Sequence, residues 1–276
     1  MTPTSFAQLK DFLHRQSGYV LQPEKTYLVE SRLLPIVEAR GIDDLDDLVA
    51  TLMTTRDLML INDVVEAMTI NETSFFRDGT PFRILIENIL PTLCETRRPD
   101  AHLRIWSAAC SMGQEPYSIA MAIKDAAGVI GRRSVEIIAT DISSRNVERG
   151  RKGLYTDHEI SRGLSPDLRD RFFSRTGSAW EVSSQLKDMV RFRTYNLLDG
   201  FTGMGMFDVV FCRNILIYLD TETKCKVLME MSKHLTSDGV IILGAAETVV
   251  GVCKAFKPAP GLRGAATLVN HLSPVA

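Results

Sequence analysis

Polar side chains that could hold a small ligand follow three apolar runs of this sequence. Glu115 comes after the run 103–106 and a stretch of mostly small residues, 107–113. Asp141 and Asn214 each stand just past another apolar run. A carboxylate such as that of Glu115, in the first turn of a helix, would repel a pyrophosphate. It suits a ligand that presents hydroxyl groups or a positive charge.

The elements around Glu115 are those from which open α/β sheets build nucleotide sites. A buried strand leads into a turn of small residues, and Pro116 stands where a helix begins. Small side chains let a ligand approach the backbone, and the helix start offers free N–H groups. S-adenosylmethionine, with ribose hydroxyls, an ammonium and a sulfonium, fits such a turn, while a turn that binds nothing is the alternative. Asp141 either binds a ribose or caps the next helix, which Ser143 or Ser144 could also do.

The order of the elements predicts the fold class. Apolar runs alternate with helical patterns over residues 101–276, which predicts an α/β domain with a doubly wound, mostly parallel sheet and a site along its carboxyl edge. Residues 1–72 have only helical patterns and predict an N-terminal helical domain. Residues 73–100 are expected to form a linker and a connecting helix. A small β-hairpin insert is expected at about residues 172–192.

Some local predictions concern single residues. Pro35 is expected to kink or break the second helix. Asp43 is a candidate cap for the third helix. The helix 221–235 is expected to close at Ser237-Asp238-Gly239.

Composition restricts the partners and the compartment. The chain has 276 residues, a net charge of -2 and 45% hydrophobic residues, so nothing in its overall charge attracts nucleic acid. No apolar run is long enough to span a bilayer. The five cysteines are scattered and lack metal-binding spacing, so reduced thiols, a cytoplasmic location and no metal site are expected.

Five motifs occur in order along the chain: NETSFFR, WSAACSMGQEPYSIA, ATDIS, YNLLD and FDVVFCRNILIYL. Together they resemble the chemotaxis receptor methyltransferases, the CheR-type protein-glutamate O-methyltransferases, over about residues 5–270. The resemblance implies a class I S-adenosylmethionine methyltransferase fold, with S-adenosylhomocysteine as the product. It also implies a bacterial, cytoplasmic monomer that methylates glutamates in the cytoplasmic helical domain of chemoreceptors, for sensory adaptation.

The resemblance also assigns expected roles to single residues. Arg77 and Tyr218 are expected to act on the acceptor, and Asp141 to bind the ribose. Cofactor contacts are expected from three regions of the chain: Asn71, Thr73 and Arg77 in the linker, Glu115 and Asp141 at the first two strands, and Asn196, Leu197, Asn214 and Ile215 further on. Asn196 and Leu197 should frame the adenine, and Asn214 and Tyr218 should face the transferring methyl. Arg32 and Arg40 are the candidates for docking an acidic receptor helix.

The implied chemistry needs no general base, because a glutamate is already an anion at pH 7, with a reference pKa of about 4.3. The enzyme has to align the reacting groups and exclude water. Two alternatives are a methyltransferase with another acceptor and a non-catalytic sensor of the cofactor. Gln114 departs from the glutamate that is common in the family, with little effect expected. The short insert suggests action without a C-terminal receptor tether.

Overall fold

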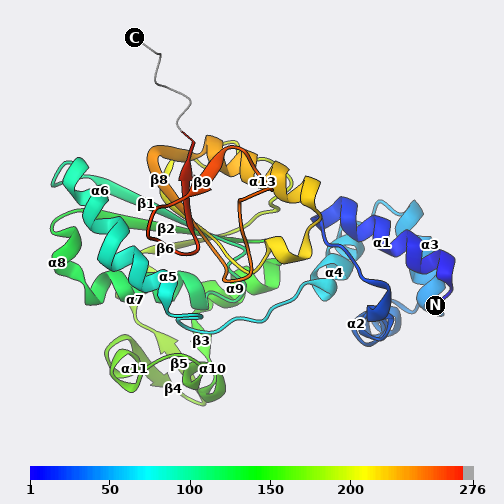
Figure 1. Cartoon of the computed structure of the whole chain (residues 1–276). Helices are drawn as coiled ribbons and strands as arrows, with labels where there is room; N and C mark the ends of the chain where they lie inside the picture. Colours follow the sequence, from blue (N-terminus) through cyan, green and yellow to red (C-terminus); the bar gives the residue numbers. More distant parts are fainter. Residues whose placement is uncertain (270–276) are drawn as a thin grey trace, which may run out of the picture. The chain divides into compact units, whose positions relative to one another are not determined.

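The computed structural model describes residues 1–269, which divide into two compact units. The N-terminal unit consists of Met1–Ile70 and the short segment Tyr218–Thr223. The larger unit consists of Asn71–Ile217 and the described residues from Lys224 onwards. Figure 1 colours both along the sequence.

The N-terminal unit is helical, as the sequence predicts. Its elements are α1 (Pro3–Ser17), η1 (Pro23–Lys25), α2 (Thr26–Arg40), α3 (Leu45–Thr54) and α4 (Leu58–Met68). Left-handed glycines end α1 and α2, at Gly18 and Gly41. The prediction for α3 is wrong by one residue, because Asp44, not Asp43, accepts the capping hydrogen bond from the amide of Asp47. The helix α2 runs through Pro35 without a break.

A helical segment of mixed type connects to the first strand of the large unit. It comprises α5 (Thr80–Ile84), the π-helical turn η2 (Leu85–Ile89) and α6 (Leu90–Thr96). Pro91 lies in the first turn of α6. A proline has no N–H to donate, so the α-helical hydrogen-bond pattern is interrupted at Pro91. The wider π turn just before it accommodates this interruption.

A seven-stranded sheet forms the centre of the large unit, with the strand order β6-β2-β1-β7-β8-β10-β9. Its strands are β1 (His102–Ala108), β2 (Ser134–Asp141), β6 (Val190–Thr194), β7 (Phe207–Cys212), β8 (Leu235–Leu243), β9 (Phe256–Pro258) and β10 (Ala265–Leu268). The first five pair in parallel, and β10 is antiparallel to both of its neighbours. This confirms the doubly wound, mostly parallel sheet, whose strand order reverses between β1 and β7.

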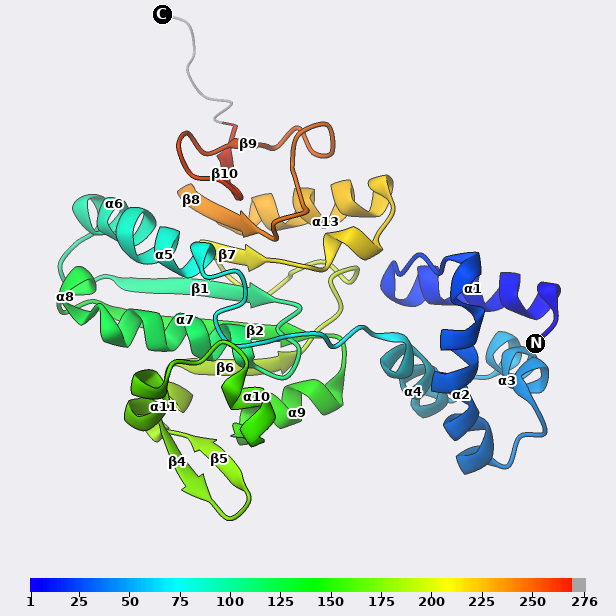
Figure 2. The same ribbon diagram turned by 60° about the horizontal axis from the view of Figure 1, so that its bottom comes forward.

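Helices lie along both faces of the sheet (Figures 1 and 2). The crossover helices are α7 (Gln114–Asp125) with the short α8 (Ala127–Ile130), α9 (Ser144–Lys152) and α13 (Thr221–Lys233). The connections from β1 to β2 and on to β6 move toward one edge of the sheet, and the connection from β7 to β8 moves toward the other. Because such crossovers are right-handed, α7 and α9 lie on one face and α13 on the other. The strands between them are almost wholly apolar: all six residues of β7 are buried.

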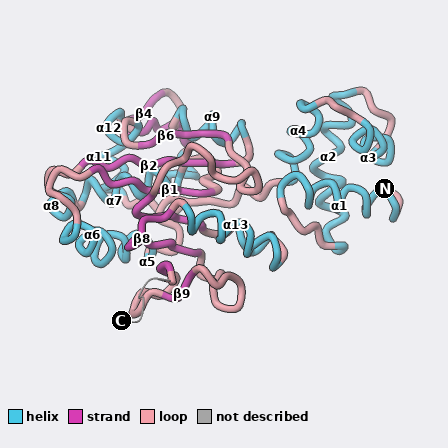
Figure 3. The backbone as a smooth tube through the Cα atoms, turned by 90° about the horizontal axis from the view of Figure 1, so that it is seen from above, coloured by secondary structure: helices cyan, strands magenta, loops and turns pink. Residues whose placement is uncertain are grey.

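A second, three-stranded sheet has the order β3-β5-β4 (Figure 2; strands are magenta in Figure 3). It consists of β3 (Leu154–Tyr155), β4 (Phe173–Thr176) and β5 (Ala179–Val182), accompanied by α10 (Asp157–Ser161), α11 (Pro166–Phe172) and α12 (Ser184–Lys187). The expected hairpin is the β4–β5 pair. The strand β3, which pairs with β5, was not expected because two residues carry no periodic signal.

One helix-end prediction is wrong. Ser237, Asp238 and Gly239 do not close α13 but lie inside β8. The register shifts there, with Phe207 opposite Leu235 and Val209 opposite Val240. The turn-forming residues are therefore accommodated as an irregularity in the strand, where the Asp238 carboxylate accepts hydrogen bonds from Arg97.

Candidate functional site

The loops that carry the predicted residues begin at one edge of the sheet. Ala108, the last residue of β1, lies opposite Thr140 of β2 and Cys212 of β7. Cys212 in turn lies opposite Leu243, the last residue of β8. Four loops therefore start side by side at the carboxyl edge, on either side of the point where the strand order reverses.

The backbone of these loops is strained. Among residues 1–269, five non-glycine residues have a positive φ: Phe76 (48°), Asp78 (68°), Ala109 (56°), Ser111 (49°) and Asn214 (59°). Two follow β1, one follows β7, and two belong to the linker segment of the same unit. Such conformations cost about 1–3 kcal/mol each and persist only where surrounding contacts hold them, as they do at many functional sites.

Glu115 lies in the first turn of α7 and is held from two sides. Its Oε1 accepts a hydrogen bond from the Ser107 hydroxyl at 2.8 Å. Its Oε2 accepts one from the Arg213 guanidinium at 2.8 Å. Burial raises the pKa of Glu115 above its ordinary value, and Arg213 opposes that rise. The ion pair therefore favours the charged form of a carboxylate that is otherwise poorly solvated.

Arg213 connects two parts of the site, a role that sequence reasoning missed. Its side chain is only 1% exposed. Besides Glu115, it donates to the Asp78 carboxylate at 2.6 Å and to the Arg77 carbonyl at 2.9 Å. It therefore ties the linker segment to the first turn of α7. A cation directly after the wholly buried strand β7 was the available signal.

Asp141 ends β2 and is 8% exposed. Its Oδ2 accepts from the Ser111 amide at 2.7 Å, and its Oδ1 accepts from the Ser143 amide at 3.0 Å. The cap of α9 is Ser143, whose hydroxyl accepts from the Asn146 amide. This decides against the capping role for Asp141, whose carboxylate instead holds the strained turn at Ser111.

The linker segment 71–79 is fixed partly by its aromatic residues. The Phe75 ring is fully buried and packs edge-on against Tyr155 and Phe173, with centroids 5.0 and 5.5 Å away. The Phe76 amide donates to the Ser118 hydroxyl at 2.9 Å. Arg77 donates to the carbonyl of its own loop at Glu72, at 2.7 Å. The segment is thus an anchored loop of the large unit.

Two further hydrogen bonds hold the side chains of Asn71, at the start of this segment, and of Asn196, in the loop after β6. The Asn71 side-chain oxygen accepts from the Asn146 amide group on α9 at 2.7 Å. Asn196 follows β6, and its side-chain oxygen accepts from the Leu198 amide at 3.1 Å. Thr73 and Leu197 are half-buried at the surface of the same unit.

The loop after β7 is held by an acidic residue that sequence reasoning also missed. Glu247 accepts hydrogen bonds from the amides of Asn214 and Ile215, at 2.8 and 2.9 Å. It stands four residues past the end of β8. The rule that singled out Asp141 after its strand would have singled out Glu247 as well.

Three predicted residues belong to the N-terminal unit. Tyr218 packs near Tyr19, with ring centroids 6.2 Å apart, and its carbonyl accepts from the Val20 amide. Its role toward the methyl group stays a prediction. Arg32 donates to the carbonyls of Ala67 and Thr69 near the end of α4.

Arg40 is also engaged within the N-terminal unit. It pairs with Asp57 and Asp63, at 2.9 Å in both cases. Both docking candidates therefore have intramolecular partners in this structure.

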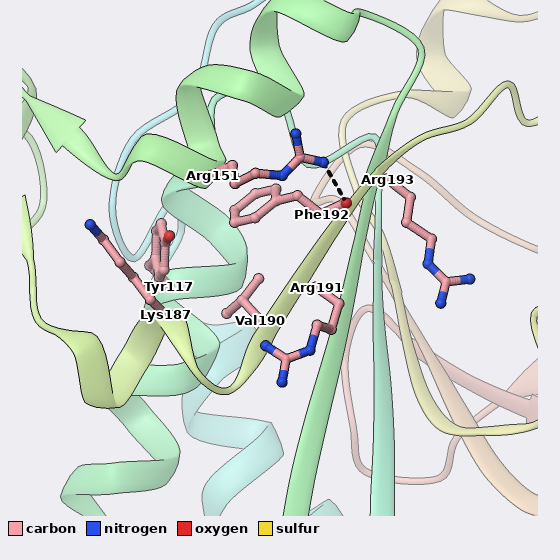
Figure 4. A pocket seen from close by; sticks show the side chains of 7 residues that line it. All are labelled: Tyr117, Arg151, Lys187, Val190, Arg191, Phe192 and Arg193. Atoms are coloured by element: carbon pink, nitrogen blue, oxygen red, sulfur yellow. Dashed lines mark hydrogen bonds between the residues drawn. The ribbon is translucent and has the colours of Figure 1, made fainter.

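A hollow of about 380 Å³ lies on the large unit against α7, α9, α12 and β6 (Figure 4). Its lining is rich in cations: Tyr117, Arg151, Lys187, Val190, Arg191, Phe192 and Arg193. Arg151 is already bound to Glu148 and to the Phe192 carbonyl, and Lys187 to Glu181. Figure 4 shows Arg193 directed away from the other cations. The cations do not converge on one point, so the carboxyl edge remains the candidate site.

Two other types of site lack support. In the described chain, no group of three or more His, Cys, Asp or Glu side chains could hold a metal ion. Burial raises the pKa of the Cys110 and Cys212 thiols well above the ordinary value, which argues against either as a nucleophile. No helix of residues 1–269 is long and apolar enough to cross a bilayer.

Comparison with known proteins matches both units to one family. Residues 71–264 match the family model "CheR methyltransferase, SAM binding domain", and residues 4–69 match "CheR methyltransferase, all-alpha domain". A chemotaxis protein methyltransferase of Vibrio parahaemolyticus is 43% identical over 251 residues, covering 89% of this chain and 90% of that protein. Chemotaxis protein methyltransferase 1 of Pseudomonas aeruginosa is 42% identical over 249 residues, covering 88% and 90%. A chemotaxis protein methyltransferase of Salmonella typhimurium is 32% identical over 261 residues, covering 93% and 88%.

Proposed function

Because this chain belongs to the CheR methyltransferase family, we propose that it methylates glutamate side chains of chemoreceptors. The chain is an S-adenosylmethionine-dependent methyltransferase of chemotaxis, as its family is. The finer proposal is that the acceptors are carboxylates in the cytoplasmic helical domain of the receptors, and that the product is a methyl ester. A cytoplasmic, monomeric protein is part of this proposal.

The carboxyl edge has features that fit S-adenosylmethionine. The hydroxyl of Ser111 and the side-chain oxygen of Gln114 are buried without a hydrogen-bond partner in the described chain. Buried polar atoms usually have partners, so these two are available to a polar ligand. The carboxylate of Glu115 accepts a hydrogen bond from Ser107 of β1, Asp141 ends the neighbouring strand β2, and a carboxylate oxygen can accept more than one hydrogen bond.

The proposed roles are those that the family resemblance implies for these residues. Glu115 binds the positively charged end of the cofactor, and Asp141 binds the ribose. Asn196 and Leu197 frame the adenine. The remaining cofactor contacts are assigned to Asn71, Thr73, Arg77, Asn214 and Ile215. When bound, S-adenosylmethionine supplies a methyl group on a sulfonium, which departs as a neutral thioether.

The chain has to align an anionic acceptor with that methyl group. The acceptor glutamate is ionised at pH 7, so no residue is required to remove a proton. With the cofactor bound, transfer would join an acceptor oxygen to the methyl carbon and would leave the electron pair of the broken bond on sulfur. Arg77 can hold one carboxylate oxygen through its planar fork. Arg77 is half-buried, which strengthens such a contact. The hydrogen bond from Tyr218 to the acceptor stays a separate expectation from the family resemblance, because Tyr218 belongs to the N-terminal unit.

Receptor docking through Arg32 and Arg40 would require a change of partners. Arg40 already pairs with two aspartates, and Arg32 with two carbonyls. An acidic receptor helix would have to replace these contacts. Docking through them is therefore expected to be weak and sensitive to salt.

The family match carries the proposal, and a labelling experiment tests it. The protein is incubated with methyl-labelled S-adenosylmethionine and receptor-containing membranes, followed by mild base. We expect the receptor to become labelled and mild base to release this label as methanol. Label that resists base would show a different acceptor atom, and no label in the presence of cofactor binding would favour a sensor.

Arg77→Ala separates the acceptor role from the cofactor role. We expect it to reduce kcat far more than S-adenosylhomocysteine affinity measured by calorimetry. The exposed Arg83 lies six residues away and makes no side-chain hydrogen bond or ion pair within the described residues, so Arg83→Ala is the matched control and should leave both values unchanged. Equal losses of rate and affinity would assign Arg77 to the cofactor alone.

A further inference from the structure

The Glu247 carboxylate accepts hydrogen bonds from backbone amides of two loops of the large unit. Its Oε1 accepts from Ile215, Leu216 and, more weakly, Ile217, at 2.9, 2.7 and 3.4 Å. Its Oε2 accepts from Asn214 at 2.8 Å and from Gly244 at 2.7 Å. Consecutive amides that point at one anion form the kind of concavity that usually binds a phosphate or another external anion. Here the anion belongs to the protein.

The turn that Glu247 binds would not be stable by itself. Asn214 has a left-handed backbone, with φ 59°. This conformation is unfavourable for a residue with a side chain, although asparagine tolerates it better than most. Four successive N–H groups that point the same way also repel one another. The Glu247 carboxylate offsets both costs, because hydrogen bonds to a charged acceptor are stronger than neutral ones.

Gly244 shows how closely the two loops approach. A Cβ atom at this position would lie 2.6 Å from Glu247 Oε2 and 3.0 Å from the Asn214 amide nitrogen. A side chain there would force Glu247 or Asn214 to shift. The loop after β8 is therefore shaped to bring the carboxylate against the loop after β7.

Glu247 also acts on the rest of the site. Among residues 1–269 it forms no ion pair, so the amides are what hold its charge. After burial, which dominates, the negative charge of Glu247 is among the causes that raise the pKa of Glu115. The two carboxylates therefore act on the same region of the sheet edge.

We propose that Glu247 is a positioning residue for methyl transfer: its carboxylate fixes Asn214 and Ile215 in the conformation that receives the cofactor. The proposal rests on the assignment of those two residues to the cofactor in the proposed function. Glu247 itself is not expected to touch the reacting atoms. Its contribution is the geometry of the turn.

A double-mutant cycle on cofactor affinity tests this role. The variants are Glu247→Gln, Asn214→Ala and the double substitution, each measured by calorimetry with S-adenosylhomocysteine. Glutamine keeps the size of the side chain but turns an N–H₂ group toward some of the amides. We expect Glu247→Gln to weaken binding by about 10- to 100-fold, the usual range for a hydrogen bond to a charged group. In the Glu247→Gln background, Asn214→Ala should then add almost nothing, because the turn is already lost.

Two controls separate positioning from general destabilisation. Glu95 is exposed and has no side-chain hydrogen bond or ion pair with residues 1–269, so Glu95→Gln should bind like the wild type. Gly244→Ala should reproduce the Glu247→Gln defect with the Glu247 carboxylate chemically intact, because the new Cβ displaces it. This second variant decides the matter if Glu247→Gln does not fold.

Either of two results would overturn the proposal: affinity within about twofold of the wild type for Glu247→Gln, or full additivity with Asn214→Ala. Failure of the proposed function is a separate outcome. If the wild type binds S-adenosylhomocysteine but labels no receptor glutamate, the acceptor assignment is wrong, while the binding cycle still decides the role of Glu247.

Discussion

Replacing Arg213 with methionine is expected to destabilise the large unit strongly. The guanidinium donates to Glu115, Asp78 and the Arg77 carbonyl, and it lies 5.7 Å from the centre of the Phe82 ring. Methionine keeps much of the apolar volume near that ring while it removes the charge and all the donors. The substitution therefore isolates the electrostatic role of Arg213.

The two carboxylates around Arg213 contribute unequally to the expected loss. Asp78 is 39% exposed, so water replaces the lost partner and its share is small. Glu115 is 14% exposed and would remain as a buried, uncompensated charge. Breaking such a pair from one side costs about 3–5 kcal/mol. For a domain of this size the midpoint of thermal unfolding should fall by about 6–20 °C.

Urea unfolding followed by tryptophan fluorescence measures this loss in the correct unit, because both tryptophans, Trp106 and Trp180, belong to it. The matched control is Arg98→Met, which breaks an ion pair with Asp100 whose side chains are 84% and 66% exposed. It should cost less than about 1 kcal/mol. Equal losses for the two variants, or a loss below about 1 kcal/mol for Arg213→Met, would refute the reasoning.

The pH dependence gives an independent check on the cause. Burial raises the pKa of Glu115 above its unfolded value of 4.5, so the folded state holds the proton more tightly and stability falls as pH rises from there. Without Arg213 this fall should be steeper. The gap between wild type and Arg213→Met should therefore widen from pH 4.5 upwards, and Glu115→Gln in the Arg213→Met background should recover part of the loss.

Two further predictions concern other parts of the chain. A Cβ on Gly163, where φ is 92°, would lie 2.0 Å from the Phe75 carbonyl, so Gly163→Ala should destabilise the large unit by several kcal/mol in urea unfolding. Gly177, with a similar positive φ and open space, is the control, and its alanine variant should cost only about 1 kcal/mol. In the N-terminal unit, the pKa of Asp220 is lowered by hydrogen bonds, of which the one from the Thr223 amide has the largest effect. The contribution of Asp220 to stability is therefore present above pH 3.8 and is lost on acidification. Thermal unfolding should show the difference between wild type and Asp220→Asn shrinking below pH 3.8, and a constant difference would contradict this cause.

The sequence predicts the elements well where the signal is local. The central strands are runs of buried residues, so their apolar pattern reveals them directly, and Gly18 marks the end of α1 through its left-handed backbone. The ends of parallel strands meet at one edge by necessity, which is why Glu115 and Asp141 could be placed together without a structure.

The sequence fails to reveal features that depend on distant partners. Arg213 binds Asp78, which precedes it by 135 residues, and no local pattern encodes that pair. The strained backbone of Ala109 and Ser111 is equally invisible, because neither residue type is typical of a left-handed conformation. Asp238 lies within the strand β8, where Arg97 binds its carboxylate. The contact with Arg97, 141 residues away in sequence, thus overrides the signal of Ser237-Asp238-Gly239 for a helix end.

The proposed chemistry requires one site to bind a cationic donor and an anionic acceptor, and the charged side chains for the two lie on different loops. A cationic methyl donor favours carboxylates, whereas an anionic acceptor favours a guanidinium. Glu115, Asp141 and Glu247 all follow strands of the sheet, and two of them are held by backbone amides, which leave the negative charge in place. Arg77 lies instead on the linker loop, where the Arg213 side chain binds its carbonyl and also reaches Glu115. If the proposed roles hold, the buried Arg213 sets the distance between the carboxylate assigned to the donor and the loop assigned to the acceptor, so its removal should disturb both stability and catalysis.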